Sequence, residues 1–357
     1  MANAMAQETR KSRVESTRLG FDTYSLRAFR WKALQLLDYA AGLKLDGIQI
    51  SGLEDFESLE PAHLISVKNH AAKLGVALDA GIGCICPSSQ SWSGKHGTPA
   101  EYLTLGLRVA RTLGAPSLRC YLGSAADRLG SIPIESHIEN TVKVLKTIRT
   151  RALDANVRIA VENHAGDMQA RETRTLIEEA GKDYVAACLD TGNPMWVVED
   201  PLVTLEVLGP YTVTTHIRDS VVFEHPRGAA AQWVALGDGV VDWKKFVARY
   251  RQLCPGAVMQ LENITGRPPQ VLPYLEPDFW KAFPKADAAE FARFVALAKR
   301  GGPHMGTMVA ADLSRIPGAP PVPAQYEAAL QEQQRFDLER SLSYAKQVLD
   351  VGVRWRS

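Results

Sequence analysis

Four apolar segments in the second half of the chain each carry, at or near their ends, a residue that can bind a metal ion. The segments are Val157–Glu162, Val185–Asp190, Val213–Ile217 and Ala257–Glu262, and these residues are Glu162, Asp190, His216 and Glu262. One such aspartate is often only a helix cap, and one such histidine is often structural. Four of them at the ends of four successive segments predict a shared site.

The chemistry of this set follows from its charges. Three carboxylates gathered without a cation would repel one another and would be driven to bind protons. A divalent ion removes that penalty, and three oxygen donors with one imidazole suit Mn²⁺, Mg²⁺, Co²⁺ or Zn²⁺. We therefore predict one bound divalent ion, and the oxygen-rich donor set favours Mn²⁺. The alternative is a hydrogen-bonded polar mouth that binds no metal.

The elements that must position these residues are predicted from the alternation of short apolar runs with amphipathic stretches. Strands are predicted at Leu19–Thr23, Gly47–Ile50, Val76–Ala80, Ser117–Tyr121, Val157–Glu162, Val185–Asp190, Val213–Ile217 and Ala257–Glu262. Helices are predicted at Trp31–Leu43, Pro61–Leu74, Ala100–Leu113, Ile134–Ala155, Thr173–Ala180, Pro201–Leu208, Trp243–Leu253 and Tyr326–Leu349.

Eight strands that are each followed by a helix are typical of a (β/α)8 TIM barrel, in which all strand ends meet at one mouth. We expect residues 18–357 to form this single domain. Gly75, Gly114 and Gly209 each follow a predicted helix, where glycine suits the left-handed position that stops a helix.

Two segments fall outside the repeating pattern. Residues 1–17 are polar and mixed in charge, so we predict a disordered N-terminal lead. Residues 266–323 form an insertion between the last strand and the last helix, with one helical stretch at Ala286–Lys299. A loop this long that opens at the mouth of a barrel predicts a lid or a dimer contact. The alternative is an irregular surface insertion.

Composition excludes several classes of partner. The chain has 357 residues and a net charge of +1, from 41 basic and 40 acidic residues, so we expect neither nucleic acid nor an anionic membrane as a partner. The sequence contains no run of about 18 apolar residues, so we expect no membrane span. The five cysteines lie in apolar runs and form no zinc-type pairs, which predicts free buried thiols and a cytoplasmic protein. Both a monomer and a homo-oligomer are compatible with this composition.

Five motifs carry a resemblance to a known family. They are V-E-N-H at 161–164, L-D-T-G-N at 189–193, H-I-R-D at 216–219, G-D-G-x-x-D-W at 237–243 and L-E-N at 261–263. With these motifs the chain resembles the sugar phosphate isomerase/epimerase family of xylose-isomerase-like barrels. It is similar to the ketose 3-epimerases and to inositol-type enzymes, from about Arg18 to Glu262 and in the final helix.

The resemblance implies a metal ion held by the four residues named above, with Glu162 and Glu262 also acting as acid and base. A metal-bound carboxylate keeps a second oxygen free to move a proton, and the cation acidifies the C–H next to a bound carbonyl. One glutamate would remove that proton and leave a metal-stabilised enediolate, and the other would return a proton. His164, Asn193 and Arg218 are expected to contact the substrate.

The sequence departs from the ketose 3-epimerases at three places. Asn193 stands where those enzymes carry a histidine, Val222 stands where they carry an arginine, and Gln49 stands where many relatives carry a glutamate. These departures leave the substrate open within the class of small sugars and polyols. Arg218 lies nearer than Val222 and is expected to replace the missing arginine.

Four functions are weighed. The first is a metal-dependent sugar isomerase or epimerase that acts through an enediolate. The second is a lyase or dehydratase that uses the same site on a keto-sugar, a keto-inositol or a 3-keto-glycoside. The third is a DNA repair endonuclease, which shares this barrel but would need several histidines at the mouth and a basic face for the nucleic acid. The chain has only eight histidines in total and a net charge near zero, so this function is disfavoured. A non-catalytic binding protein is disfavoured by the intact set of metal-binding residues.

Overall fold

The computed structural model describes residues 17–304, 306, 312 and 323–356. The predicted disordered lead, apart from Thr17, lies outside these residues, as does part of the predicted insertion.

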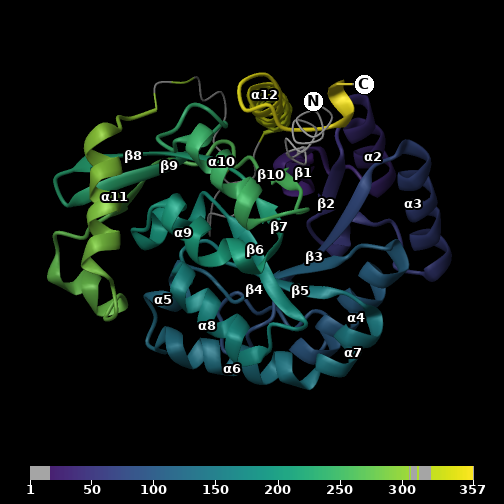
Figure 1. The fold of residues 1–357 in the computed structure, drawn as a ribbon, viewed down its shortest axis with the longest axis horizontal. Coiled ribbons are helices and arrows are strands. Elements are labelled where there is room, and N and C mark those ends of the chain that lie inside the picture. The colour runs from purple at the N-terminus through teal and green to yellow at the C-terminus, as the bar shows by residue number, and fades with distance from the viewer. Residues whose placement is uncertain (1–16, 305, 307–311, 313–322, 357) are drawn as a thin grey trace, which may run out of the picture.

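Eight parallel strands form the predicted barrel, and they pair in the order β10-β1-β2-β3-β4-β5-β6-β7 (Figure 1). They are β1 (Leu19–Asp22), β2 (Gly47–Ile50), β3 (Ala77–Cys84), β4 (Ser117–Tyr121), β5 (Arg158–Glu162), β6 (Val185–Asp190), β7 (Thr212–His216) and β10 (Met259–Leu261). Every one of these strands overlaps a predicted strand, and the largest difference is that β3 extends to Cys84.

The outer strands of this sheet, β7 and β10, meet with few backbone contacts, and we call this junction the β7–β10 seam. A single parallel bridge joins Ile217 to Leu261, and the amide of Ile217 donates to the carbonyl of Gln260 at 2.7 Å. The hydroxyl of Thr215 donates to the carbonyl of Val258 at 2.9 Å and accepts from the amide of Gln260 at 3.0 Å. A side chain thus replaces part of the backbone ladder where the barrel closes.

Helices cover the outside of the barrel. They are α2 (Ala33–Gly42), α3 (Pro61–Leu74), α4 (Pro99–Leu113), α5 (Ala125–Arg128), α6 (Ile134–Thr147), α7 (Arg149–Ala155), α8 (Ala170–Ala180), α9 (Pro201–Leu208), α10 (Trp243–Leu253) and α12 (Ala324–Gln347). The predicted helix at 134–155 is interrupted at Ile148, where φ is −108° and ψ is 2°, so it forms α6 and α7. Short 3₁₀ helices are η1 (Thr23–Phe29), η2 (Leu53–Asp55), η3 (Asn193–Val197), η4 (Gly209–Tyr211), η5 (Pro277–Ala282) and η6 (Arg354–Arg356).

Two of the three predicted helix-stopping glycines adopt the left-handed conformation. Gly75 has a φ of 67° and Gly114 a φ of 75°, and each ends its helix as expected. The prediction was wrong for Gly209, whose φ is −49° and which continues into η4. Packing explains this glycine, because a Cβ there would lie 2.7 Å from the Cβ of Leu253.

A second, smaller sheet projects from one side of the barrel, and the sequence did not predict it. It pairs in the order β11-β9-β8, all antiparallel, from β8 (Asp219–His225), β9 (Gly228–Val234) and β11 (Gln270–Leu272). Helix α11 (Ala288–Arg300), which was predicted, packs against β8 (Figure 1). A separate hydrophobic cluster lies between them, and it includes Val222, Leu272 and Phe294. The described part of the insertion therefore belongs to this side layer.

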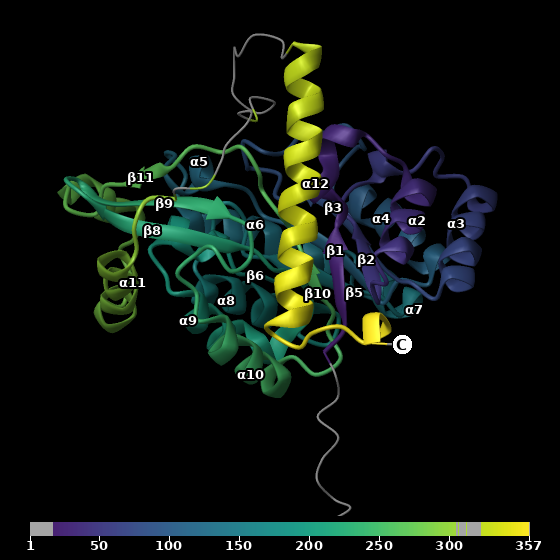
Figure 2. The same cartoon turned by 90° about the horizontal axis from the view of Figure 1, so that it is seen from above.

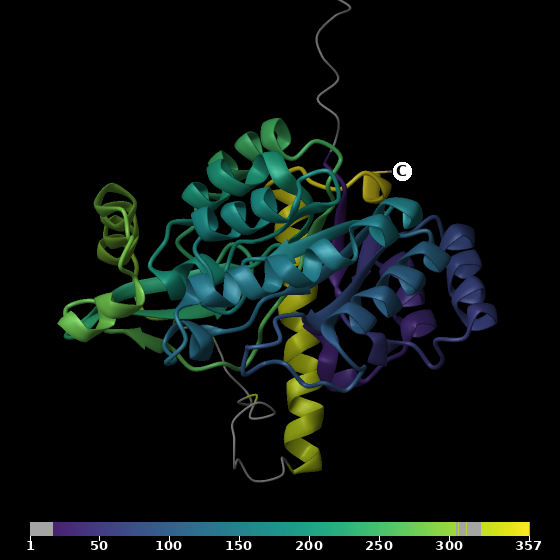
Figure 3. The ribbon, with the colours of Figure 1, turned by 90° about the horizontal axis from the view of Figure 1, so that it is seen from below.

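Helix α12 lies on the outside of the barrel beside β1 and β10, and its first turns extend past the barrel (Figure 2 and Figure 3). The side chain of Gln334 on α12 accepts a hydrogen bond from the amide of Ala28 in η1, and Leu338 and Leu342 are buried in the main core. Within the described residues, we find no helix that combines the length and the apolar character needed to cross a membrane.

Candidate metal centre

The four residues predicted to bind a metal come together at one end of the barrel. Glu162, Asp190 and His216 are the last residues of β5, β6 and β7, and Glu262 directly follows β10. These strands are neighbours, so their ends converge, and a potential ligand atom of each residue lies within 4.8 Å of those of the others. All four side chains are buried.

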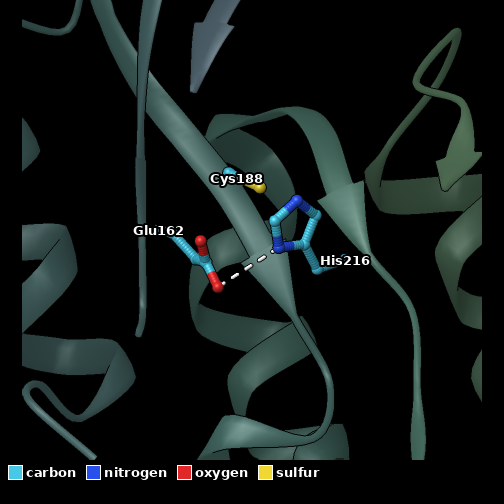
Figure 4. Close-up of side chains that lie close together, drawn as sticks. All are labelled: Glu162, Cys188 and His216. Carbon is cyan, nitrogen blue, oxygen red and sulfur yellow. Dashed lines mark ion pairs between the residues drawn. The ribbon is translucent and has the colours of Figure 1, made fainter. Parts of the chain in front are cut away.

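His216 turns one ring nitrogen toward the carboxylates. Its Nε2 lies 2.6 Å from the side-chain oxygen of Gln49, and the Gln49 amide donates to the hydroxyl of Thr214 at 2.7 Å. That hydroxyl donates to Asp79 at 3.1 Å, so the chain of donors makes Nε2 the protonated nitrogen. Nδ1 then lies 3.2 Å from Glu162 and has no hydrogen-bond partner (Figure 4).

A ring nitrogen without a hydrogen-bond partner, surrounded by carboxylate oxygens, is an arrangement that can bind a cation. Nδ1 is also 3.4 Å from Oε2 of Glu262, another buried atom without a hydrogen-bond partner. Burial alone would lower the pKa of His216, but Glu262 and Glu162 outweigh it and raise that pKa well above its usual value. The carboxylates thus attract positive charge to Nδ1, and a divalent ion would supply it in place of a proton. The donor set fits a divalent ion.

The three carboxylates differ in their pKa values because their neighbours differ. Burial raises the pKa of Asp190, although Arg218 opposes this. Burial also raises the pKa of Glu262, to about 7. Burial acts in the same direction on Glu162, but Arg119 and His216 hold its pKa well below the usual range.

Arg119, which the sequence did not identify as a site residue, is the main partner of Glu162. It lies on β4, is buried, and its Nε donates to Oε2 of Glu162 at 2.5 Å, with Nη2 in contact with the same oxygen. Nη1 donates to the carbonyl of Ile82 at 3.2 Å. The available signal was a charged residue between Leu118 and Cys120 in an apolar strand, since a buried charge needs a partner.

Arg218 bridges two of the predicted ligands. Its guanidinium contacts Asp190 through Nε and Nη2, and Nη2 lies 2.7 Å from Glu262. The guanidinium also lies 4.8 Å from the ring centre of Trp233, which comes from the unpredicted strand β9. Gly192 leaves room for it, because a Cβ there would lie 2.5 Å from the Cγ of Arg218.

The other predicted substrate contacts also lie near the centre. The side-chain amide of Asn193 donates to Glu162 at 3.2 Å, and its Oδ1 is buried without a partner. His164 stacks on Tyr121, with ring centres 3.9 Å apart, and its Nδ1 lies 2.6 Å from the carbonyl of Gly123. Burial lowers the pKa of His164 to about 4, so its ring is neutral near pH 7 and donates to that carbonyl.

Two nearby residues have other roles. Cys188 on β6 lies close to Glu162 and His216 (Figure 4), but burial raises its pKa well above the usual value, which disfavours the thiolate that a metal needs. Asp219 accepts hydrogen bonds from the Trp243 indole at 2.6 Å and from two backbone amides of the loop before α10. It therefore organises that loop and is not the partner of His216. All five cysteines are free and buried, as predicted.

A cavity of about 580 Å³ opens beside the centre. Glu262, Arg218, Asn193 and His164 line it, whereas Glu162, Asp190 and His216 do not. Of the predicted ligands, therefore, only Glu262 faces the space that a substrate would occupy.

Comparison with known proteins places this geometry in context. A family model described as a xylose isomerase-like TIM barrel matches residues 37–270. A 3-oxo-isoapionate decarboxylase from Pectobacterium atrosepticum is 23% identical over 242 residues, which are 63% of this chain and 78% of the relative. The crystal structure of a D-psicose 3-epimerase in the presence of D-fructose superposes with a TM-score of 0.56 and 17% identity, covering 93% of this chain and 99% of the other. A xylose isomerase-like TIM barrel protein from Mycobacterium smegmatis in complex with magnesium gives a TM-score of 0.55 and 12% identity, covering 81% and 98%.

Proposed function

Because the chain belongs to the xylose isomerase-like TIM-barrel family, we propose that it is a divalent-metal-dependent isomerase or epimerase acting on a small sugar. The observation that carries this proposal is the gathering of Glu162, Asp190, His216 and Glu262 around an imidazole nitrogen without a hydrogen-bond partner, beside a cavity of about 580 Å³. We propose Mn²⁺ as the ion, on the oxygen-rich donor set.

The reaction would begin with removal of a proton from the carbon next to a carbonyl. A divalent ion held by the four residues would supply the polarisation of that carbonyl and its neighbouring hydroxyl, which acidifies the C–H bond. Glu262 lines the cavity, so we assign the first proton transfer to it. Asn193, Arg218 and His164 would orient the sugar hydroxyls from the same cavity wall.

Glu162 meets the requirements of a ligand better than those of a second base. Its Oε1 faces His216 at 3.2 Å, and its Oε2 is taken by Arg119. The free second oxygen that the two-glutamate scheme requires is therefore occupied. Epimerisation with a proton returned from the opposite face would need Arg119 to release this oxygen, whereas isomerisation by a single base would not.

The lyase reading is the second candidate, and the difference between the glutamates favours it. Loss of carbon dioxide from a 3-keto acid breaks the C–C bond, sends its electron pair to the ketone oxygen and then needs one proton at the α-carbon, which Glu262 alone could deliver. The likeness to a 3-oxo-isoapionate decarboxylase supports this reading.

One experiment tests the function and separates the candidates. The protein is loaded with Mn²⁺, its metal content is measured by elemental analysis, and it is incubated in D₂O with a panel of ketoses and of 3-keto sugar acids. Deuterium in a recovered or isomerised sugar supports the isomerase, and release of carbon dioxide supports the lyase. The proposal fails if the protein binds no divalent ion, or if the loaded protein neither exchanges a proton nor transforms any member of the panel.

A further inference from the structure

We propose that the substrate carries a carboxylate and that Arg267, beside Arg27, binds it; this inference rests on the proposed function. Among the described residues, six cationic side chains line the cavity, against three acidic ones, Glu54, Asp55 and Glu262. The six are Arg27, Arg30, Lys32, Arg119, Arg218 and Arg267. Arg30 pairs with Glu327 at 2.7 Å, and Lys32 lies beside Glu54 and Asp55, so the other four cations carry the argument.

The cations beside the metal centre are matched within that centre. Besides the three carboxylate ligands, the carboxylate of Asp22 lies 3.4 Å from Nε2 of His216 and is buried. Four carboxylates, two arginines and one divalent ion sum to a charge of about zero when every group is ionised. Arg119 and Arg218 are therefore matched within the centre, and a second positive region remains.

That second region is formed by Arg27 and Arg267, which share the carboxylate of Asp312. Both guanidiniums contact the same oxygen, Oδ2, at 2.5 Å from Nη2 of Arg27 and at 3.5 Å from Nη2 of Arg267. The exposed fractions of the three side chains are 13%, 20% and 2% for Arg27, Arg267 and Asp312. The carboxylate of Asp312 is thus shared between two guanidiniums in a partly buried place on the cavity wall.

Arg267 is the member of this group that is available to a ligand. Arg27 is already held by Asp312, by the carbonyl of Thr265 at 3.2 Å and by the carbonyl of Tyr24 at 3.1 Å. By contrast, Arg267 reaches Asp312 only at 3.5 Å, and its Nε is buried without a hydrogen-bond partner among the described residues. Since an unmatched buried donor is costly, an anion at this wall would relieve it.

The ligand chemistry follows from shape and charge. A guanidinium presents parallel N–H donors that match the two oxygens of a carboxylate. A phosphate ester could meet the same donors but carries nearly two negative charges at pH 7, so a phosphate is included in the test below. The inferred substrate is therefore a keto-sugar acid, with its ketone at the metal centre and its carboxylate at Arg267.

Binding of unreactive probes tests this inference without turnover. We would titrate the Mn²⁺-loaded protein calorimetrically with D-gluconate, with the neutral polyol D-glucitol and with D-glucitol 6-phosphate, which carries a phosphate and no carboxylate. D-gluconate should bind more tightly than D-glucitol, and Arg267→Met should weaken gluconate about tenfold or more, as for loss of a hydrogen bond to a charged group. Arg267→Lys should retain part of the affinity.

Arg227→Met is the matched control, because Arg227 pairs with Glu276 at the surface and does not line the cavity. It should leave gluconate binding unchanged, and thermal melting should show that both methionine variants are folded. Equal binding of gluconate and glucitol, or equal binding by Arg267→Met and the wild type, overturns the inference. So does an Arg267-dependent affinity for D-glucitol 6-phosphate that exceeds the affinity for gluconate, which would assign the wall to phosphate. Because no reaction is needed, this test can fail while deuterium exchange into neutral ketoses still supports the proposed function, and the reverse also holds.

Discussion

The two glutamates of the centre lie on opposite sides of it and have different surroundings. Glu162 is enclosed, with Arg119 on one oxygen and His216 and Asn193 near the other. Glu262 lines the cavity and contacts Arg218 at 2.7 Å. Two residues of the same type, at the same end of the barrel, therefore have different freedom to move a proton.

The difference arises from what each neighbouring strand supplies. In the β4–β5 ladder, Arg119 pairs with Ala160 and Tyr121 pairs with Glu162, so the arginine lies beside the glutamate and deeper in the barrel. Glu262 follows β10, the shortest strand of the barrel, and its neighbour across the seam is β7. Glu162 thus meets an arginine from within the adjacent strand, whereas Glu262 meets Arg218, which follows the adjacent strand β7.

The largest effect is expected at Glu262. Glu262→Gln keeps an oxygen donor but cannot move a proton, so kcat should fall by about 10²–10⁴-fold, as for loss of a general base. Metal content, measured by elemental analysis, should fall much less than kcat. Glu206→Gln, at a surface ion pair with Arg249, is the matched control and should leave kcat unchanged.

Glu162→Gln should also abolish turnover, but through loss of the ion. The variant weakens a ligand and leaves Arg119 buried without its partner. Metal affinity should therefore fall together with kcat, and excess Mn²⁺ should restore part of the activity. A Glu162→Gln protein that binds the ion normally yet is inactive would contradict this division of roles and would restore Glu162 as a second base.

Arg119→Met tests the enclosed side directly. It removes the guanidinium that holds Oε2 of Glu162 and leaves that buried carboxylate oxygen without its cation. The free energy of unfolding of the metal-free protein should therefore fall by about 3–5 kcal/mol in a denaturant titration. The control Arg149→Met breaks an exposed pair with Asp183 and should cost no more than about 1 kcal/mol. If the Arg119→Met/Glu162→Gln double variant is not more stable than Arg119→Met alone, the pairing is not the cause.

Gln49 should have a smaller effect, on metal affinity. Its side-chain oxygen accepts from Nε2 of His216 and so keeps Nδ1 free for the ion. Gln49→Leu should weaken Mn²⁺ binding by about 10–100-fold, as for other residues that orient a metal ligand. Gln49→Glu retains an acceptor and should bind Mn²⁺ nearly as well. Equal affinities of the leucine and glutamate variants, by calorimetry, would rule out this orienting role.

The smallest effect is a change with pH, and it has opposite signs for the two glutamates. Burial raises the pKa of Glu262 to about 7, whereas the pKa of Glu162 stays well below its usual range. Ion binding must displace the proton of Glu262 and the second proton of His216, whose pKa is also raised, but none from Glu162. Mn²⁺ affinity should therefore fall as pH decreases, and the fall should steepen by about a further tenfold per pH unit below pH 7, where Glu262 becomes protonated. In the metal-free protein, the raised pKa means that stability is lost as pH rises through 7.

Thermal melting with and without Mn²⁺ at pH 6 and pH 8 checks this sign. The increase in Tm on adding Mn²⁺ should be larger at pH 8. An equal increase at both pH values would show that the ion displaces no proton from Glu262 or His216 at pH 6, which would contradict both raised pKa values.

The alternation of strands and helices sufficed to predict the barrel and the place of the four predicted ligands, because strand ends of a closed parallel sheet converge. The role of Arg119 could not be predicted, since a charged residue within a strand does not reveal its partner. The side layer was also missed: β9 begins Gly228-Ala229-Ala230-Ala231, which lacks the branched and aromatic residues typical of strands. The contact of Trp233 on β9 with the Arg218 guanidinium was therefore not predicted either.

The β7–β10 seam gives the predicted ion a second task. His216 ends one strand of that seam and Glu262 follows the other, while only a bridge at Ile217 and the hydroxyl of Thr215 join the backbones there. A cation bound to both side chains would fasten the two edges of the sheet across its weakest junction. We therefore expect amide protons of β7 and β10 to exchange with solvent more slowly once Mn²⁺ is added, and those of β2 and β3 to change little.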